Sequence, residues 1–215
     1  MKILLVDDHQ IVCDGLRLCL EGNPAHQVVG EAADGLTAIR LARELKPDAI
    51  ILDVAMPGLN GIEVARHILA EAHKAPKIIC LSMHSDQEFI AEAFRAGVDG
   101  YMLKSSAFKE LSHALEEVAS GKKYLSPSIT DTILENFVRK SPEEIAGPFT
   151  VLTPRERQIL QMLAEGRSAK QIATVLDISH KTVHAFRSQI MTKIGTTSLS
   201  ELTKYAIRHG LTTVE

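Results

Sequence analysis

The stretch AIILDVAMPG, residues 49–58, joins a continuous apolar run to one acid and a Pro-Gly turn. An apolar run without polar alternation is typical of a strand covered on both faces, as in a parallel sheet. The run ends at Asp53, which places a carboxylate at the carboxyl end of the strand. Ligands of open α/β sheets bind outside that edge. We therefore expect a parallel α/β domain with Asp53 at its ligand-binding edge.

The same pattern occurs five times in residues 1–121. Apolar, β-branched runs alternate with stretches of helical period. The runs lie at 2–8, 28–32, 49–53, 77–83 and 100–104, and the helical stretches at 10–21, 35–45, 60–72, 86–96 and 107–120. Five strands that alternate with five helices predict one α/β domain, a doubly wound five-stranded parallel sheet that ends near residue 121.

Polar residues stand at the ends of four of these five strands. They are Asp7 and Asp8, Asp53, Ser82 and Lys104. Clustered carboxylates repel one another unless a cation is present, and Mg²⁺ prefers such oxygen ligands. Alternatively, Asp7 and Asp8 cap the first helix and Lys104 is solvated. The recurrence at four strand ends favours a functional site.

Residues 1–121 resemble the flavodoxin-like receiver domain of bacterial two-component response regulators. The resemblance rests on Asp7-Asp8, Asp53, Met56-Pro57-Gly58, Gly61, Ser82 and Lys104. It implies that Asp53 accepts a phosphoryl group from a phosphohistidine of a sensor histidine kinase. It also implies a magnesium site made by Asp8, Asp53 and the backbone carbonyl of Ala55, with Asp7 acting through water.

Physical chemistry supports these roles. Phosphoryl transfer needs positive charge around the equatorial oxygens, which Mg²⁺ and the Lys104 ammonium supply. The resemblance makes Ser82 and Tyr101 a switch pair, in which the Ser82 hydroxyl moves to the phosphoryl group and opens space for the Tyr101 ring. The alternative for Tyr101 is a half-buried aromatic on an edge strand. We expect no metal role for His9 and His84, because Mg²⁺ selects oxygen and neither has a partner at ligand spacing.

Residues 122–149 are predicted to form a linker. Ser126-Pro127 is typical of a helix start, and a stripe of helical period follows it. The stripe is Ile129, Ile133, Leu134 and Phe137. Beyond Lys140 the chain has the composition of a flexible tether, which permits the two flanking domains to dock or to separate.

End signals predict four helices in residues 150–215. Their starts are Thr153-Pro154-Arg155-Glu156, Ser168 to Gln171, Ser179, and Ser198 to Glu201, and their ends are Gly166, Asp177, Gly195 and Gly210. The first and the last of these starts have capping-box spacing, and the first has a proline at the first helical position. Only residues 177–179 separate the second helix from the third, the tight connection of a helix-turn-helix.

Periodicity orients the helix predicted between 179 and 195. An apolar stripe faces the core, and a small, polar, partly basic face lies opposite. The stripe is Val183, Phe186, Ile190 and Ile194, and the polar face is Lys181, His184, Ala185, Ser188 and Thr192. Such a face suits a major groove about 12 Å wide. The alternative is a solvated helix of an ordinary bundle.

Residues 150–211 resemble the LuxR-type (NarL/FixJ) DNA-binding domain. The resemblance rests on Leu152-Thr153-Pro154-Arg155-Glu156, Ala164-Glu165-Gly166, Ile172-Ala173 and Lys181-Thr182-Val183. It implies base contacts from His184, Ala185 and Ser188, and phosphate contacts from Lys181 and Arg187. Family members often have His where this chain has Phe186, which we expect to add packing. The segment 201–211 is most similar to the GacA/UvrY branch.

Composition bounds the protein as a whole. Its 215 residues, 45% hydrophobic and 24% charged, suffice for two packed domains. Residues 150–215 carry net charge +4 and the rest −7, which favours two domains with different partners. No apolar run approaches the roughly 20 residues of a membrane span, and the N-terminus is too acidic for a signal peptide. We expect a cytoplasmic protein in which Cys13, Cys19 and Cys80 stay reduced.

The sequence thus predicts a DNA-binding regulator controlled by phosphorylation of Asp53, with no enzymatic activity beyond its own phosphorylation and dephosphorylation. We expect a homodimer on palindromic promoter DNA, with RNA polymerase as a further partner. One alternative is a phosphohydrolase, but residues near Asp53 offer no second acid for a leaving group. The other is a regulator with an inert receiver, against which the complete acid set argues.

Overall fold

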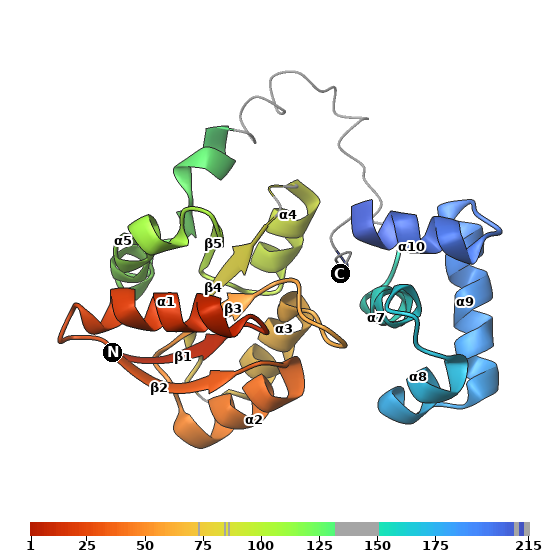
Figure 1. Ribbon diagram of the computed structural model, residues 1–215, viewed down its shortest axis with the longest axis horizontal. Helices are drawn as coiled ribbons and strands as arrows, with labels where there is room; N and C mark the ends of the chain where they lie inside the picture. The colour runs from red at the N-terminus through yellow and green to blue at the C-terminus, as the bar shows by residue number, and fades with distance from the viewer. Residues whose placement is uncertain (73, 84, 86, 132–150, 209–210, 213–215) are drawn as a thin grey trace. The chain divides into compact units, whose positions relative to one another are not determined.

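The computed structural model describes residues 1–215 apart from residues 73, 84, 86, 132–150, 209–210 and 213–215 (Figure 1). The chain divides into two compact units, residues 1–140 and 141–215. Each unit has its own buried core. The two units are therefore considered separately.

The first unit is an α/β domain with one parallel sheet. Its strands are β1 (Lys2–Val6), β2 (Gln27–Ala32), β3 (Ala49–Asp53), β4 (Lys77–Ser82), β5 (Gly100–Leu103) and β6 (Tyr124–Leu125). Its helices are α1 (Gln10–Glu21), α2 (Gly35–Leu45), α3 (Gly61–Glu71), α4 (Gln87–Arg95) and α5 (Ala107–Ala119). The strand order is β2-β1-β3-β4-β5-β6. The predicted five strands and five helices are confirmed.

The sixth strand was not predicted. Tyr124 and Leu125 pair in parallel with Gly100 and Tyr101, so β5 is not an edge strand. Two residues are too few to display a period-2 pattern. The sheet therefore extends three residues or more beyond the predicted end of the domain near residue 121.

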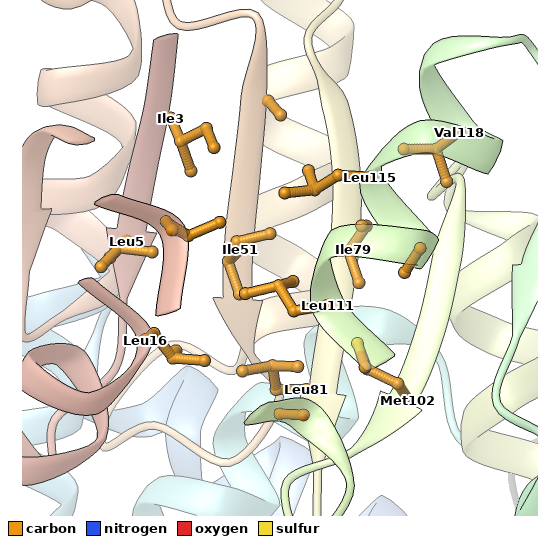
Figure 2. Close-up of a cluster of buried hydrophobic side chains, with 14 of the residues drawn as sticks. Ile3, Leu5, Leu16, Ile51, Ile79, Leu81, Met102, Leu111, Leu115 and Val118 are labelled. Carbon is orange, nitrogen blue, oxygen red and sulfur yellow. The ribbon is translucent and has the colours of Figure 1, made fainter. Parts of the chain in front are cut away.

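The sheet is buried by helices on both faces (Figure 1). On one face, α1 and α5 pack their apolar sides against the central strands, in a core that includes Leu16, Ile51, Leu81 and Leu111 (Figure 2). Every residue of β3 is buried, which explains why the four residues before Asp53 are all apolar. The three cysteines are free thiols, two of them buried and Cys19 half-buried.

The sheet order places the functional edge. The chain leaves β1 for β2 on one side and returns to β3 on the other, so the carboxyl ends of β1 and β3 meet where the strand order reverses. Gly61 permits a close approach there, because a Cβ at Gly61 would lie 2.0 Å from the backbone oxygen of Asp53. Glycine thus lets α3 begin directly against the end of β3.

The described part of the second unit is helical. It contains α7 (Pro154–Ala164), α8 (Ala169–Leu176), α9 (His180–Ile194) and α10 (Leu199–Arg208). The capping box predicted at Thr153 begins α7, and α8 begins at the predicted Ser168, where the structure also has a capping box. Among the described residues, no helix combines the length and apolar character that a membrane crossing needs.

The capping box predicted at Ser198 is wrong. The Glu201 carboxylate accepts from the hydroxyl of Thr196, and the backbone N–H of Ser198 donates to the same hydroxyl oxygen at 3.2 Å. The Glu201 carboxylate thus bonds to Thr196, and not to the Ser198 N–H as a capping box requires. Sequence spacing could not reveal this, because the competing hydroxyl precedes the predicted cap.

The predicted linker is described only at its start. The backbone N–H groups of Ile129 and Thr130 both donate to the Ser126 carbonyl at 3.0 Å, so a helical turn begins where the sequence predicts. Ile129 is buried. The other residues of the predicted stripe and the tether lie outside the described residues.

Candidate functional site

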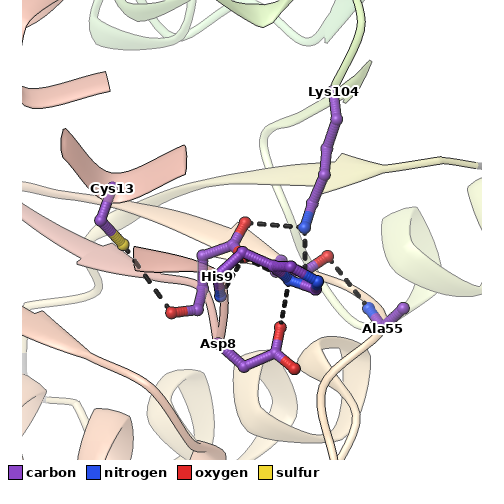
Figure 3. Close-up of polar contacts among 7 residues, drawn as sticks. Asp8, His9, Cys13, Ala55 and Lys104 are labelled. Atoms are coloured by element: carbon purple, nitrogen blue, oxygen red, sulfur yellow. Dashed lines mark hydrogen bonds and ion pairs between the residues drawn. The ribbon is translucent and has the colours of Figure 1, made fainter. Parts of the chain in front are cut away.

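An ammonium group and two buried carboxylates meet at the carboxyl edge of the sheet. Lys104 Nζ lies 2.7 Å from Asp7 Oδ2 and 2.8 Å from Asp53 Oδ2 (Figure 3). Both carboxylate side chains are 1% exposed and the Lys104 side chain is 12% exposed. The backbone N–H of Lys104 donates to the Ser82 carbonyl at 2.8 Å, which fixes the lysine beside β4. The three residues come from the ends of three different strands.

Asp53 is also held by the loop that follows it. Its Oδ1 accepts from the backbone N–H of Ala55 at 3.1 Å. This contact orients Oδ2 towards Lys104. Ala55 touches the acid through its amide, and the role of its carbonyl as a metal ligand stays a prediction.

His9 joins the cluster, although the sequence predicts no role for it there. Its Nδ1 lies 2.8 Å from Asp8 Oδ1 and 3.3 Å from Asp7 Oδ1. Oxygen or nitrogen atoms of Asp7, Asp8, His9 and Asp53 all lie within 4.8 Å of one another. The expectation that His9 lacks a partner at ligand spacing is therefore wrong, because its partners are the two residues immediately before it. His84 lies outside the described residues.

The donor set fits a hard divalent cation. Three carboxylates face one ammonium, so negative charge is in excess when the acids are ionised. Carboxylate oxygens within a few ångströms of one another are ligands that Mg²⁺ prefers. The sequence-predicted ligands Asp7, Asp8 and Asp53 are thus brought together.

Burial and charge shift the ionisation of this cluster. Burial, with the neighbouring Asp7 carboxylate, raises the pKa of Asp53, although Lys104 opposes the change. Burial would lower the pKa of Lys104, but the Asp53 and Asp7 carboxylates raise it overall. Lys104 is therefore charged at neutral pH, whereas ionised Asp53 is in an unfavourable environment that a bound cation would relieve.

The predicted switch pair is buried on neighbouring strands. Ser82 is 1% exposed and Tyr101 is fully buried. Tyr101 pairs with Cys80, two residues before Ser82, so both side chains project from the same face of the sheet. The alternative of a half-buried aromatic on an edge strand is wrong, because β6 covers β5 and the Ser126 N–H donates to the Tyr101 carbonyl at 3.1 Å.

In the second unit, α9 has the predicted orientation. Its apolar stripe is turned inwards, with Val183 and Ile190 buried and Phe186 and Ile194 half-buried. Its opposite face is exposed at Lys181, His184, Ala185, Ser188 and Thr192, and Arg187 beside it is half-buried. Lys193 Nζ of α9 lies 2.7 Å from Glu156 Oε2 of α7, and this ion pair holds α9 against α7.

Family models match both units. The response regulator receiver domain matches residues 3–116, and the model of bacterial regulatory proteins of the luxR family matches residues 150–206. The chain belongs to the NarL/FixJ family of response regulators. It is a phosphorylation-controlled, DNA-binding regulator of a two-component system, whose partners are a histidine kinase and DNA.

Individual relatives agree with this assignment. Oxygen regulatory protein NreC of Staphylococcus aureus is 36% identical over 215 residues, which cover 98% of this chain and 99% of that one. A LuxR-family response regulator from Aurantimonas is 43% identical, covers 64% of this chain and 98% of its own, and superposes with a TM-score of 0.61. Salmonella typhimurium RcsB is 27% identical over 95% of this chain and 96% of its own, with a TM-score of 0.72. The GacA/UvrY resemblance stays a prediction.

Proposed function

We propose that Asp53 is the phosphoacceptor of this regulator and that the exposed face of α9 binds promoter DNA. The observation that carries the first part is the sharing of Lys104 Nζ between Asp7 and Asp53, at 2.7 and 2.8 Å. This geometry holds one oxygen of Asp53 beside a positive charge at the edge of the sheet. The domain limits that we propose are a receiver at 1–121, extended by β6, a linker to 149 and a DNA-binding domain at 150–215.

The proposed reaction transfers a phosphoryl group from a histidine nitrogen of the kinase to a carboxylate oxygen of Asp53. An oxygen of Asp53 forms a bond to phosphorus while the P–N bond of the kinase phosphohistidine breaks, and the electron pair of that bond stays on the imidazole nitrogen. The Lys104 ammonium stabilises the charge on the phosphoryl oxygens. Mg²⁺ held by Asp8, Asp53 and the Ala55 carbonyl, with Asp7 through water, would supply further positive charge there. Hydrolysis of the acyl phosphate at this same pocket resets the protein.

Ser82 and Tyr101 are proposed to report the phosphorylation. The new phosphoryl oxygens accept from the Ser82 hydroxyl, whose strand also holds the Lys104 backbone. Tyr101 projects from the same face of the next strand. A move of Ser82 therefore changes the space that is available to the Tyr101 ring.

On DNA, the exposed face of α9 supplies two kinds of contact. We assign Lys181 and Arg187 to phosphates, and His184, Ala185 and Ser188 to base edges. His184→Ala should cost about 1–3 kcal/mol on the specific site and little on scrambled DNA. An equal loss on both sequences would remove His184 from base recognition.

Phosphorylation is proposed to favour pairing of two chains on a palindromic site, with RNA polymerase as a predicted further partner. A solved structure of RcsB contains two dimers of that protein bound to two DNAs. Two-fold pairing matches two half-sites about one helical turn apart. In the unphosphorylated chain, the receiver either occludes α9 or fails to pair.

Sedimentation and DNA titration with and without beryllofluoride, a phosphoryl mimic, test this coupling. The wild type should gain mass and DNA affinity with the mimic and Mg²⁺, whereas Asp53→Ala should gain neither. The same mass and affinity under both conditions for the wild type would contradict the coupling and support the inert-receiver alternative. A response retained in Asp53→Ala would contradict the assignment of Asp53.

A further inference from the structure

Two histidines stand one helical turn apart at the start of α9. The ring centroids of His180 and His184 are 4.5 Å apart with an angle of 71° between the planes, and their Nε2 atoms are 3.3 Å apart. The rings therefore converge at their Nε2 atoms. Both residues are exposed, and within the described part of the chain neither ring has a second hydrogen-bond partner.

The separation of these nitrogens matches that of two ligands on one metal ion. Two imidazole nitrogens on a tetrahedral Zn²⁺, each about 2.0–2.1 Å from the metal, stand about 3.3 Å apart. Histidines four residues apart on a helix are an established way to present two zinc ligands from one face. In the metal-free protein the same spacing lets the two nitrogens share one proton.

We propose that His180 and His184 bind a transition-metal ion of the zinc class, and that its occupation withdraws His184 from DNA. Neutral imidazole suits Zn²⁺, Cu²⁺ and Ni²⁺, whereas Mg²⁺ prefers the oxygen cluster at Asp53. A ring nitrogen that coordinates metal cannot bond to a base edge. The effect on DNA rests on the proposed function of α9, whereas metal binding by the pair does not.

The surroundings make this a weak, reversible site. The protein supplies two ligands, and water fills the remaining positions. Among the described residues, no carboxylate or carbonyl orients either ring through its other nitrogen, the support that tightens metal sites. Lys181 and Arg187, on the same helix, oppose a cation. Occupation therefore follows the free metal concentration.

The first test is direct binding of Zn²⁺ to the full-length protein, with saturating Mg²⁺ present to occupy the oxygen cluster. Imidazole NMR signals, assigned with His180→Gln and His184→Gln, should show that both rings respond to the same equivalent of Zn²⁺. Glutamine keeps size and polarity but is not a zinc ligand. His180→Gln should abolish the response of His184, and a response that survives this change would overturn the proposal.

The second test is DNA affinity. Zn²⁺ should weaken wild-type binding to a specific site about tenfold, the loss expected for one base contact, and a chelator should restore it. His180→Gln, which keeps His184, should show no zinc effect. His9→Gln is the matched control, because it removes a histidine beside the oxygen cluster, and it should respond to Zn²⁺ like the wild type.

Equal weakening of the wild type and His180→Gln by Zn²⁺ would overturn the competition with DNA. Failure of the proposed function has a different result. In that case the metal-free wild type would lack specific DNA affinity, while the paired NMR response to Zn²⁺ would persist.

Discussion

Each unit contains a buried carboxylate bound to a lysine, and the two pairs have opposite electrostatic outcomes. Asp53 lies 2.8 Å from Lys104 in the receiver, and Glu156 lies 2.7 Å from Lys193 in the helical unit. The pKa of Asp53 is raised, and burial is the largest cause. Burial also acts to raise the pKa of Glu156, but hydrogen bonds from Lys193 and Thr153 lower it overall.

The difference lies in the partners. Asp53 shares its ammonium with the second buried carboxylate of Asp7, so two negative charges compete for one positive charge. Among the described residues, Glu156 is the one carboxylate that contacts the Lys193 ammonium. It also accepts from the backbone N–H and the hydroxyl of Thr153, at 2.8 and 3.0 Å. Excess buried charge is typical of a functional site, here the cation and phosphoryl site that we propose at Asp53, whereas compensated charge is typical of a structural ion pair.

The largest predicted effect comes from removal of the shared ammonium. Lys104→Met leaves two buried carboxylates without the ammonium that they share and should lower receiver stability by about 3–5 kcal/mol at neutral pH. Urea unfolding followed by near-UV circular dichroism of the tyrosines measures this loss. Mg²⁺ should recover part of it, because the acids can still bind a cation.

Lys122→Met is the matched control, because Lys122 makes an exposed ion pair with Glu117. It should change stability by less than about 0.5 kcal/mol. A similar loss in both variants would mean that burial of charge at the sheet edge has no special energetic role.

The next largest effect concerns the compensated pair. Glu156→Gln should lower the stability of the helical unit by about 1–3 kcal/mol, because it removes charged hydrogen bonds. The pKa of Glu156 is lowered on folding, so its contribution is present above the unfolded-state pKa and is lost as pH falls through the folded-state value. Calorimetry over acidic pH should therefore show a flatter pH dependence in the variant, and parallel curves would contradict the assignment.

Substitution of Asp53 is expected to have a smaller effect on stability, and to raise it. Its pKa is raised by burial, so the ionised carboxylate opposes folding at neutral pH and protonation relieves this as pH falls. Asp53→Asn should raise receiver stability by about 1 kcal/mol in the absence of Mg²⁺, since Lys104 keeps Asp7. Destabilisation measured by urea titration would show that Asp53 is compensated like Glu156.

The smallest stability effect is expected on the solvated face of α9. Lys181→Ala should leave stability within about 0.5 kcal/mol, yet reduce the slope of log affinity against log salt by about one. Fluorescence anisotropy at several salt concentrations measures this slope. Lys204→Ala, at an exposed position of α10, is the control, and an equal change in slope there would show that only net charge matters.

Sequence alone predicted the regular parts of this molecule well, because they follow local rules. The continuous apolar run before Asp53 and the caps at Thr153 and Ser168 specify their elements within a few residues. The 100° periodicity of α9 predicted its buried and exposed faces. Residues at strand ends could be grouped because parallel strands bring their carboxyl ends to one edge.

What escaped prediction depends on contacts that no local pattern encodes. The two-residue strand β6 is defined by its pairing with β5. The partnership of Glu156 with Lys193 spans 37 residues between two helices. No partner at ligand spacing was expected for His9, although its ring contacts Asp7 and Asp8, which precede it directly.

The central claim is that the uncompensated carboxylate of Asp53 receives the phosphoryl group. The most direct measurement is mass-spectrometric mapping of the full-length protein after incubation with a small acyl phosphate and Mg²⁺. The account predicts one phosphoryl group, located on Asp53, and none on Asp53→Asn under the same conditions. A wild-type protein that takes up no phosphoryl group, or takes it up equally in the variant, would contradict the account.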